Sequence, residues 1–192
     1  MLGRLIEALA RVMAILGGLV LTALILMTCL SIAGRWLNGL LNSDALDGAS
    51  WATALLGLGI GPINGDFELV EAGMAFVIFA FLPITQLTGG HASVDIFTRA
   101  LGPGVNRGLT ALWSVVFAAV LILIAVQLWA GTQDKMRYGE TTYLIQFPIW
   151  WAYAGALAGA VSAALTAVYV AVVRIAEMTT GHVILPEQEA DH

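Results

Sequence analysis

Four long apolar segments restrict the fold of this chain more than any other feature of its sequence. They cover residues 12–34, 67–88, 108–132 and 148–173. Crossing the hydrocarbon core of a bilayer takes about 20 apolar residues of helix, so each segment is long enough. Because lipid offers the backbone no hydrogen-bond partner, such segments must be helical. The sequence therefore predicts an all-α membrane protein in which four transmembrane helices form a compact bundle.

The predicted bundle occupies one domain, residues 1–178, and residues 179–192 are expected to be a disordered tail rich in polar and acidic residues. Residues 49–63, between the first two spans, are apolar but only 15 residues long. That length suits an interfacial or re-entrant segment better than a span. The alternative, a fifth span, would move the C-terminus to the opposite side of the membrane.

The first apolar segment could also belong to a cleaved signal peptide, since Arg4 and Arg11 precede it. Its apolar run has 23 residues, whereas the apolar core of a signal peptide has about 7–15. Residues 26–29 resemble a lipoprotein box only faintly, because Met27 and Thr28 fit it poorly. We interpret the segment as the first membrane helix.

Basic residues in the short loops predict the orientation of the four spans. Positively charged residues are enriched in the cytoplasmic loops of membrane proteins. An N-terminus inside the cell leaves five basic residues on the inner side: Arg4, Arg11, Arg99, Arg107 and Arg174. The outer side then holds three: Arg35, Lys135 and Arg137. The sequence predicts that both ends of the chain are cytoplasmic (N-in/C-in).

Composition argues against several classes of protein. Only 11% of the 192 residues are charged, against about 25% in soluble proteins. The eight basic residues form no cluster, so we expect no nucleic-acid partner. Cys29 is the single cysteine, and no histidine lies within a predicted span. We therefore expect no disulfide within the chain, no metal site, no haem or other cofactor and no enzymatic activity.

Glu68 and Glu71 lie in the first turns of the second predicted span. They lie three residues apart and so share one helix face, near the outer end where Arg35 closes the first helix. Three interpretations remain open. Arg35 pairs with Glu68 or Glu71 and ties the first two spans together; the acids contact a partner subunit; or they form a coupling-ion or proton site. No third acid or polar cluster near the midplane supports the last.

The segment after the second span carries two further candidates, His91 and Asp95. Asp95 lies four residues before Arg99 and could pair with it on a helix. His91 has no neighbouring metal ligand, so we interpret it as a polar loop residue.

The fourth span begins with Pro148, which suits the first turn of a helix. Trp150 follows it at the level where aromatic residues meet the membrane surface. Gly155 and Gly159 lie four residues apart among several alanines, and small residues at this spacing let helices approach closely. The glycines serve either packing within the chain or docking onto another membrane protein, and both alternatives remain open.

Four stretches occur in a fixed order along the chain. They read GDFELVE over residues 65–71, FLP over 81–83, GGHASVDIF over 89–97 and GETTYLIQFPIWW over 139–151. Together they resemble the small membrane subunit, the DctQ-like family, of tripartite ATP-independent periplasmic (TRAP) transporters. The resemblance is strongest from Gly65 to Tyr153, and the first helix agrees in layout only. The outer segment from Asn38 to Asn64 is longer than expected for that family.

The resemblance implies a multi-pass protein of the bacterial inner membrane that pairs with a large membrane subunit. That large subunit holds the substrate and sodium sites and moves as an elevator. A periplasmic solute-binding protein delivers an organic acid or a related solute. The small subunit enlarges the static scaffold around the moving domain. On this resemblance Glu68, Glu71, His91 and Asp95 match family positions and would act in structure or at a subunit interface.

Two other functions remain as alternatives. An independent channel or small exporter would need a polar stripe through the spans, and the third and fourth spans offer little beyond Gln127, Ser162 and Thr166. A membrane anchor of a redox complex would be expected to bind a haem.

Overall fold

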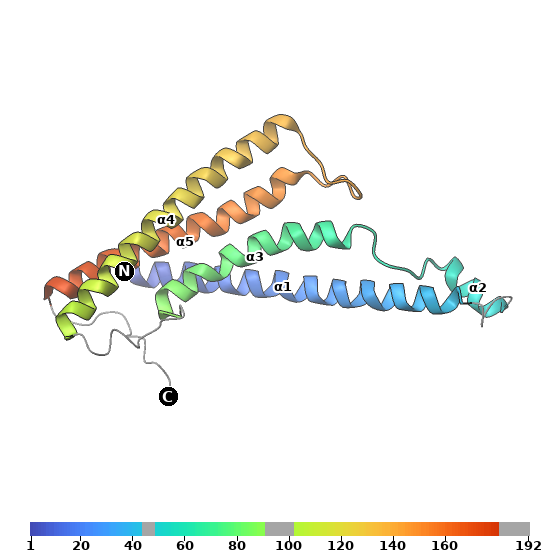
Figure 1. Ribbon diagram of the computed structural model, residues 1–192, viewed down its shortest axis with the longest axis horizontal. Helices are drawn as coiled ribbons and strands as arrows, with labels where there is room; N and C mark the ends of the chain where they lie inside the picture. The colour runs from blue at the N-terminus through green and yellow to red at the C-terminus, as the bar shows by residue number, and fades with distance from the viewer. Residues whose placement is uncertain (44–48, 91–101, 181–192) are drawn as a thin grey trace.

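The computed structural model describes residues 1–43, 49–90 and 102–180. These residues form five helices, and the described parts of the chain contain no strand (Figure 1). The helices are α1 (Leu2–Leu41), α2 (Ser50–Gly57), α3 (Asp66–Thr88), α4 (Pro103–Tyr138) and α5 (Ile149–Thr180). Their order and all-α character confirm the predicted fold class.

Helices α1, α3, α4 and α5 are long and apolar enough to cross a membrane. They contain the four predicted spans, but three of them extend well beyond the apolar runs. Helix α1 has 40 residues and would be about 60 Å long, so it exceeds a hydrocarbon core of about 30 Å. Helix α5 continues to Thr180, two residues into the predicted tail. The remainder of that tail lies outside the described residues.

The ambiguous segment between the first two spans, residues 49–63, contains the short helix α2. This helix has eight residues, or about 12 Å of helix, which is too short to cross a bilayer. The described part of the chain therefore holds four candidate spans, as predicted. Figure 1 shows α2 folded beside the far end of α1, beyond the beginning of α3.

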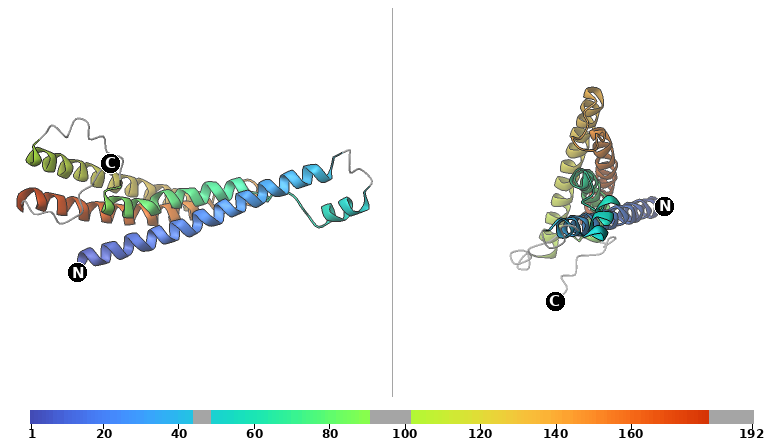
Figure 2. Two further views of the ribbon diagram at one scale, coloured as in Figure 1. Left: turned by 90° about the horizontal axis from the view of Figure 1, so that it is seen from below. Right: turned by 90° about the vertical axis from the view of Figure 1, so that its right-hand side faces the viewer.

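The four long helices form an open slab and not the compact bundle that the sequence predicts. Helix α5 packs against α4 on one side and α3 on the other, and α3 packs against α1. At the end where α3 begins, the order α4–α5–α3–α1 runs from top to bottom in Figure 1. The end-on view shows α4 and α5 side by side and α1 running out to the right (Figure 2, right). Because α4 and α1 form the two edges of the slab, neither is enclosed by the rest of the chain.

How much of each span is buried within the chain depends on its place in the slab. About 56% of the most apolar stretch of α5 is buried within the chain, against 11–17% for the other three spans. Large apolar side chains are consequently exposed on the edge helices. They include Leu26, Leu30, Leu123 and Val126, which are 59–66% exposed. In a soluble protein such surfaces would be unfavourable, so they must meet lipid or another membrane protein.

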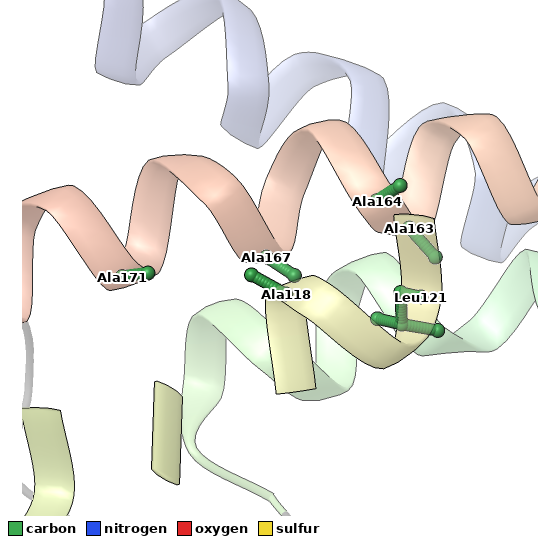
Figure 3. Packing of buried hydrophobic residues seen from close by; sticks show 6 residues of the cluster. All are labelled: Ala118, Leu121, Ala163, Ala164, Ala167 and Ala171. Atoms are coloured by element: carbon green, nitrogen blue, oxygen red, sulfur yellow. The ribbon is translucent and has the colours of Figure 1, made fainter. Parts of the chain in front are cut away.

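The core between α4 and α5 consists mainly of alanine. Ala118 and Leu121 of α4 face Ala163, Ala164, Ala167 and Ala171 of α5 (Figure 3). Small side chains let two helices approach closely, and this contact is the main source of attraction between helices in lipid. The long α4–α5 hairpin is therefore joined along its length by close backbone packing.

The slab has two ends. The end where α3 begins also holds the connection between α4 and α5, and we call it the Asp66 end. The opposite end, where α3 finishes at Thr88, holds the first residues of α1 and the last turn of α5 (Figure 1). The chain therefore crosses the slab four times, and its first residues and Thr180 lie on the same side.

Candidate functional site

The polar residues singled out in the sequence gather at the Asp66 end, around the first turn of α3. Gly65 precedes this turn with a φ of +76°, a left-handed conformation that favours glycine. A methyl group at this position would collide with the side chain of Ile145, from the α4–α5 connection. Gly65 thus both turns the chain into α3 and lets that connection lie close to it.

Asp66 joins α3 to α1. The Ser31 hydroxyl donates a hydrogen bond to Asp66 Oδ2 at 2.5 Å, and Arg35 Nη2 lies 3.6 Å from the same oxygen. Ser31 Oγ also accepts a hydrogen bond from the backbone N–H of Ile63 at 3.1 Å. Ser31 is fully buried, whereas the Arg35 side chain is 66% exposed. The buried hydroxyl is therefore the centre of this contact.

This arrangement corrects the partner predicted for Arg35. Arg35 contacts Asp66, and the described residues include no ion pair between Arg35 and Glu68 or Glu71. Helix phase provides the reason. Each residue turns the helix by about 100°, so Asp66 and Glu68 point in nearly opposite directions. Asp66 faces α1, and Glu68 faces the α4–α5 connection.

Glu68 joins α3 to that connection. Its two carboxylate oxygens accept hydrogen bonds from the backbone N–H groups of Leu144, at 2.7 Å, and Ile145, at 3.1 Å. Charged acceptors form stronger hydrogen bonds than neutral ones. Glu68 therefore satisfies two backbone donors that no helix or strand would satisfy, and it does so within the chain.

The α4–α5 connection, residues 139–148, is also closed upon itself. The N–H of Thr142 donates to the carbonyl of Phe147 at 2.9 Å, and the N–H of Ile149 donates to the carbonyl of Glu140 at 3.0 Å. Lys135, in the last turn of α4, pairs with Glu140 at 2.6 Å. The connection is a compact loop held at both ends and pinned to α3 by Glu68.

The segment from Leu58 to Gly65 runs back along the last turns of α1. Asn38 Nδ2 donates to the carbonyl of Ile60 at 2.7 Å. One turn earlier, α1 carries Gly34, and a methyl group there would collide with the carbonyl oxygen of Gly61. Most of the long outer segment thus forms a hairpin-like arm with α1, fixed by contacts of the backbone.

A groove lies beside Glu68, between α3, α4 and α5. It has a volume of about 330 Å³. Two glutamates line it, together with small or apolar side chains from three helices and the loop: Glu68, Glu71, Ala72, Ala75, Phe79, Leu128, Thr142, Phe147, Ile149, Ala152, Tyr153 and Ala156. Glu71 is exposed, and it forms no hydrogen bond or ion pair with the residues that the structure describes. The sequence analysis considered the two glutamates as a pair. In the structure Glu68 is bonded to the loop, whereas Glu71 has no partner among the described residues.

The first residues of α5 lie close to this groove. Pro148 immediately precedes α5, and its carbonyl accepts a hydrogen bond from the N–H of Trp151 at 3.1 Å. Helix α5 therefore begins at Ile149, one residue after the position predicted from the sequence. Trp150 contacts Trp151 edge-to-face, with ring centroids 5.8 Å apart. These aromatic residues mark the Asp66 end of α5.

Gly155 and Gly159 pack within the chain. A Cβ on Gly159 would lie 2.7 Å from Cβ of Phe79 and 3.1 Å from its backbone, and one on Gly155 would lie 3.7 Å from Phe76. The glycines therefore allow α5 to approach α3. This contact supports the first of the two alternatives for these residues, packing within the chain.

The two remaining candidates, His91 and Asp95, lie outside the described residues, as does the possible Asp95–Arg99 pair. Sequence reasoning missed three participants at the Asp66 end: Ser31, Asp66 and the backbone of the loop at residues 144 and 145. Asp66 stands within the GDFELVE stretch, two residues before Glu68, and was the available signal. Sequence reasoning also missed the ion pair between Arg174 and Glu177 of α5, whose side chains are 13% and 8% exposed.

Comparison with known proteins identifies the family. The sequence profile described as "Tripartite ATP-independent periplasmic transporters, DctQ component" matches residues 24–178. No curated protein and no solved structure matches the chain significantly. The matched region includes all of α3 and α4, the Asp66 end, the second half of α1 from residue 24 and most of α5. Since this region is well over half of the chain, the protein belongs to the DctQ family, the small permease component of TRAP transporters.

Proposed function

We propose that this subunit is a static scaffold for the large membrane subunit of a TRAP transporter. In this assembly a periplasmic solute-binding protein delivers an organic acid or a related solute. The large subunit then imports the solute, driven by a sodium gradient. Membership of the DctQ family supports the assembly, and the architecture of the slab supports the scaffold role.

The observation that carries the scaffold role is the contrast between apolar faces and internally satisfied polar groups. The edge helices α1 and α4 expose large apolar side chains over much of their length. By contrast, Asp66 and Glu68 are engaged within the chain. A flat body with rigid polar contacts and free apolar faces can lie against a second membrane protein without changing shape.

The buried hydroxyl groups of the spans do not favour an independent channel. Thr132, Ser162 and Thr166 each donate to the carbonyl four residues earlier in their own helix. A hydroxyl used in this way leaves its helix apolar toward its neighbours. The described spans thus offer little polar surface along which a solute could move.

The proposal includes an orientation. Both ends of the chain face the cytoplasm of a bacterial cell, in the inner membrane, and the Asp66 end faces the periplasm. The bias of basic residues toward the inner loops supports this orientation. The loop over residues 139–148 then lies on the side from which the solute arrives. So does the arm that α1 forms with the segment from Leu58 to Gly65.

Co-purification tests the proposal. A tagged chain is extracted from its native cells in mild detergent, next to an unrelated four-helix membrane protein with the same tag. We expect a much larger membrane protein with many more spans to accompany this chain in a constant ratio and to be absent from the control. Reproducible isolation of the chain alone would refute the scaffold role.

A further inference from the structure

The groove beside Glu68, with a volume of about 330 Å³, has room for a long side chain from another protein. Its two walls are lined by alanines, Ala72 and Ala75 of α3 and Ala152 and Ala156 of α5. These small side chains leave open space between α3 and α5. Because both helices belong to the apolar spans, the groove lies in the membrane part of the slab and not on a soluble face.

Glu71 places a negative charge on this apolar groove. It lies five residues after Asp66, about 8 Å along α3 from the beginning of the helix. An ionised group inside a span is costly unless it meets an opposite charge, water or another polar group. Glu68 has both oxygens occupied by the loop, but Glu71 has no partner among the described residues. The described residues therefore supply no positive charge that could pair with Glu71.

We propose that this groove receives a lysine or arginine side chain from a membrane helix of the large subunit, and that its cationic group pairs with Glu71. The inference rests on the proposed function, because it assigns one contact of the assembly. The aliphatic stem of such a side chain would lie between the alanines, and its charged end would reach toward the Asp66 end. Long basic side chains use their stems and charged ends in this way near membrane surfaces.

Charge favours this occupant over a phospholipid. A zwitterionic lipid would bring an anionic phosphate to a rim that already carries Glu68 and Glu71. A basic side chain brings a single positive charge without a negative one. The depth of Glu71 along a spanning helix also favours a membrane-embedded partner over the soluble binding protein.

Charge substitutions at Glu71 test the contact in the full complex. Glu71→Gln removes the charge, and Glu71→Lys would repel a basic side chain. Asp134→Asn is the matched control, since Asp134 is an exposed acid of α4 near the same end that does not line the groove. We measure the amount of large subunit that stays with the tagged chain as salt concentration rises.

We expect Glu71→Gln to reduce the amount of retained large subunit about tenfold or more. The reason is that removing one partner of a desolvated charge pair leaves the other charge unpaired and weakens binding. Glu71→Lys should abolish retention, and Asp134→Asn should retain as much as the native chain. Because Glu71 is exposed and forms no hydrogen bond or ion pair with the described residues, the variants should elute from size exclusion as folded protein. Equal retention by the native chain and both Glu71 variants would overturn the contact while leaving the scaffold role intact. Failure of the native chain to retain the large subunit would refute the scaffold role itself.

Photo-crosslinking identifies the occupant directly. A photoreactive amino acid in place of Ala75, on the wall of the groove, should crosslink to a peptide of the large subunit that contains a lysine or arginine. The same substitution at Val126, an exposed residue of α4 outside the groove, provides the control and should not crosslink to that same peptide. Crosslinks from position 75 to lipid only would overturn the inference.

Discussion

Ser31 and Arg35 lie one turn apart on α1, and both contact Asp66, but their environments differ. Ser31 is fully buried and also accepts a hydrogen bond from Ile63. Arg35 is mostly exposed, and exposed ion pairs contribute little to stability. We expect Ser31→Ala to destabilise the protein by about 1 kcal/mol or more, and Arg35→Ala to have less than half of that effect. Thermal unfolding in detergent measures both.

Thr22→Ala is the control for Ser31→Ala. Thr22 is an exposed hydroxyl of the same helix that bonds only to the carbonyl of Gly18, and its removal should leave the unfolding temperature unchanged. A larger loss of stability from Arg35→Ala than from Ser31→Ala would contradict the assigned roles.

Two glycines of α1 differ in what surrounds them. A methyl group on Gly34 would collide with the backbone of Gly61, but one on Gly18 would meet no atom within 4 Å. We expect Gly34→Ala to loosen the segment from Leu58 to Gly65, with a cost of about 1–3 kcal/mol for overpacking. Gly18→Ala should be neutral or slightly stabilising, because alanine favours a helix.

Thermal unfolding and limited proteolysis of the segment after α2 would compare the two glycine variants. Identical cleavage rates in Gly34→Ala and Gly18→Ala would show that the backbone contact between α1 and this segment does not form.

At the scale of elements, Glu68 fixes the loop between α4 and α5. Glu68→Ala removes the acceptor of two backbone N–H groups, those of Leu144 and Ile145. We expect amide hydrogen exchange at these two residues to accelerate about tenfold or more, because their protection depends on that carboxylate. Glu71→Ala is the matched control and should leave the exchange of the loop unchanged. Unchanged exchange in both variants would mean that the loop is held by other contacts.

The positions of the spans could be predicted from the sequence, since the thickness of the bilayer sets the length of an apolar run. The ends of the helices could not. Helix α1 begins at Leu2 and includes Arg4, Glu7 and Arg11, because a helix can continue into the headgroup region and water where charged side chains are solvated. The apolar run therefore identifies the crossing of the membrane but not the length of the helix.

The acids near the beginning of α3 were found from the sequence, but their contacts were not. The choice of Asp66 over Glu68 as the partner of Arg35 depends on the phase of α3 relative to α1, and the pattern of apolar residues does not specify it. The contact between Glu68 and the loop was further hidden because its donors are backbone groups. Such donors carry no signature in the identity of a side chain.

At the scale of the whole molecule, the order of the helices depends on which faces carry small residues. Helix α5 has alanines or glycines on more than one face, and this is the feature that lets it pack between α4 and α3. The sequence shows these residues but not their neighbours, so it predicted a compact bundle. The open slab arises because α5 packs between α4 and α3, and α3 in turn packs between α5 and α1.

The central claim is that this chain supports transport without carrying out transport itself. Solute uptake into sodium-loaded and sodium-free proteoliposomes tests it most directly, with the chain alone, the large subunit alone, and both subunits together, each in the presence of the binding protein. The account predicts no uptake by the chain alone and sodium-dependent uptake when both membrane subunits and the binding protein are present. Uptake by the chain without the large subunit would contradict it.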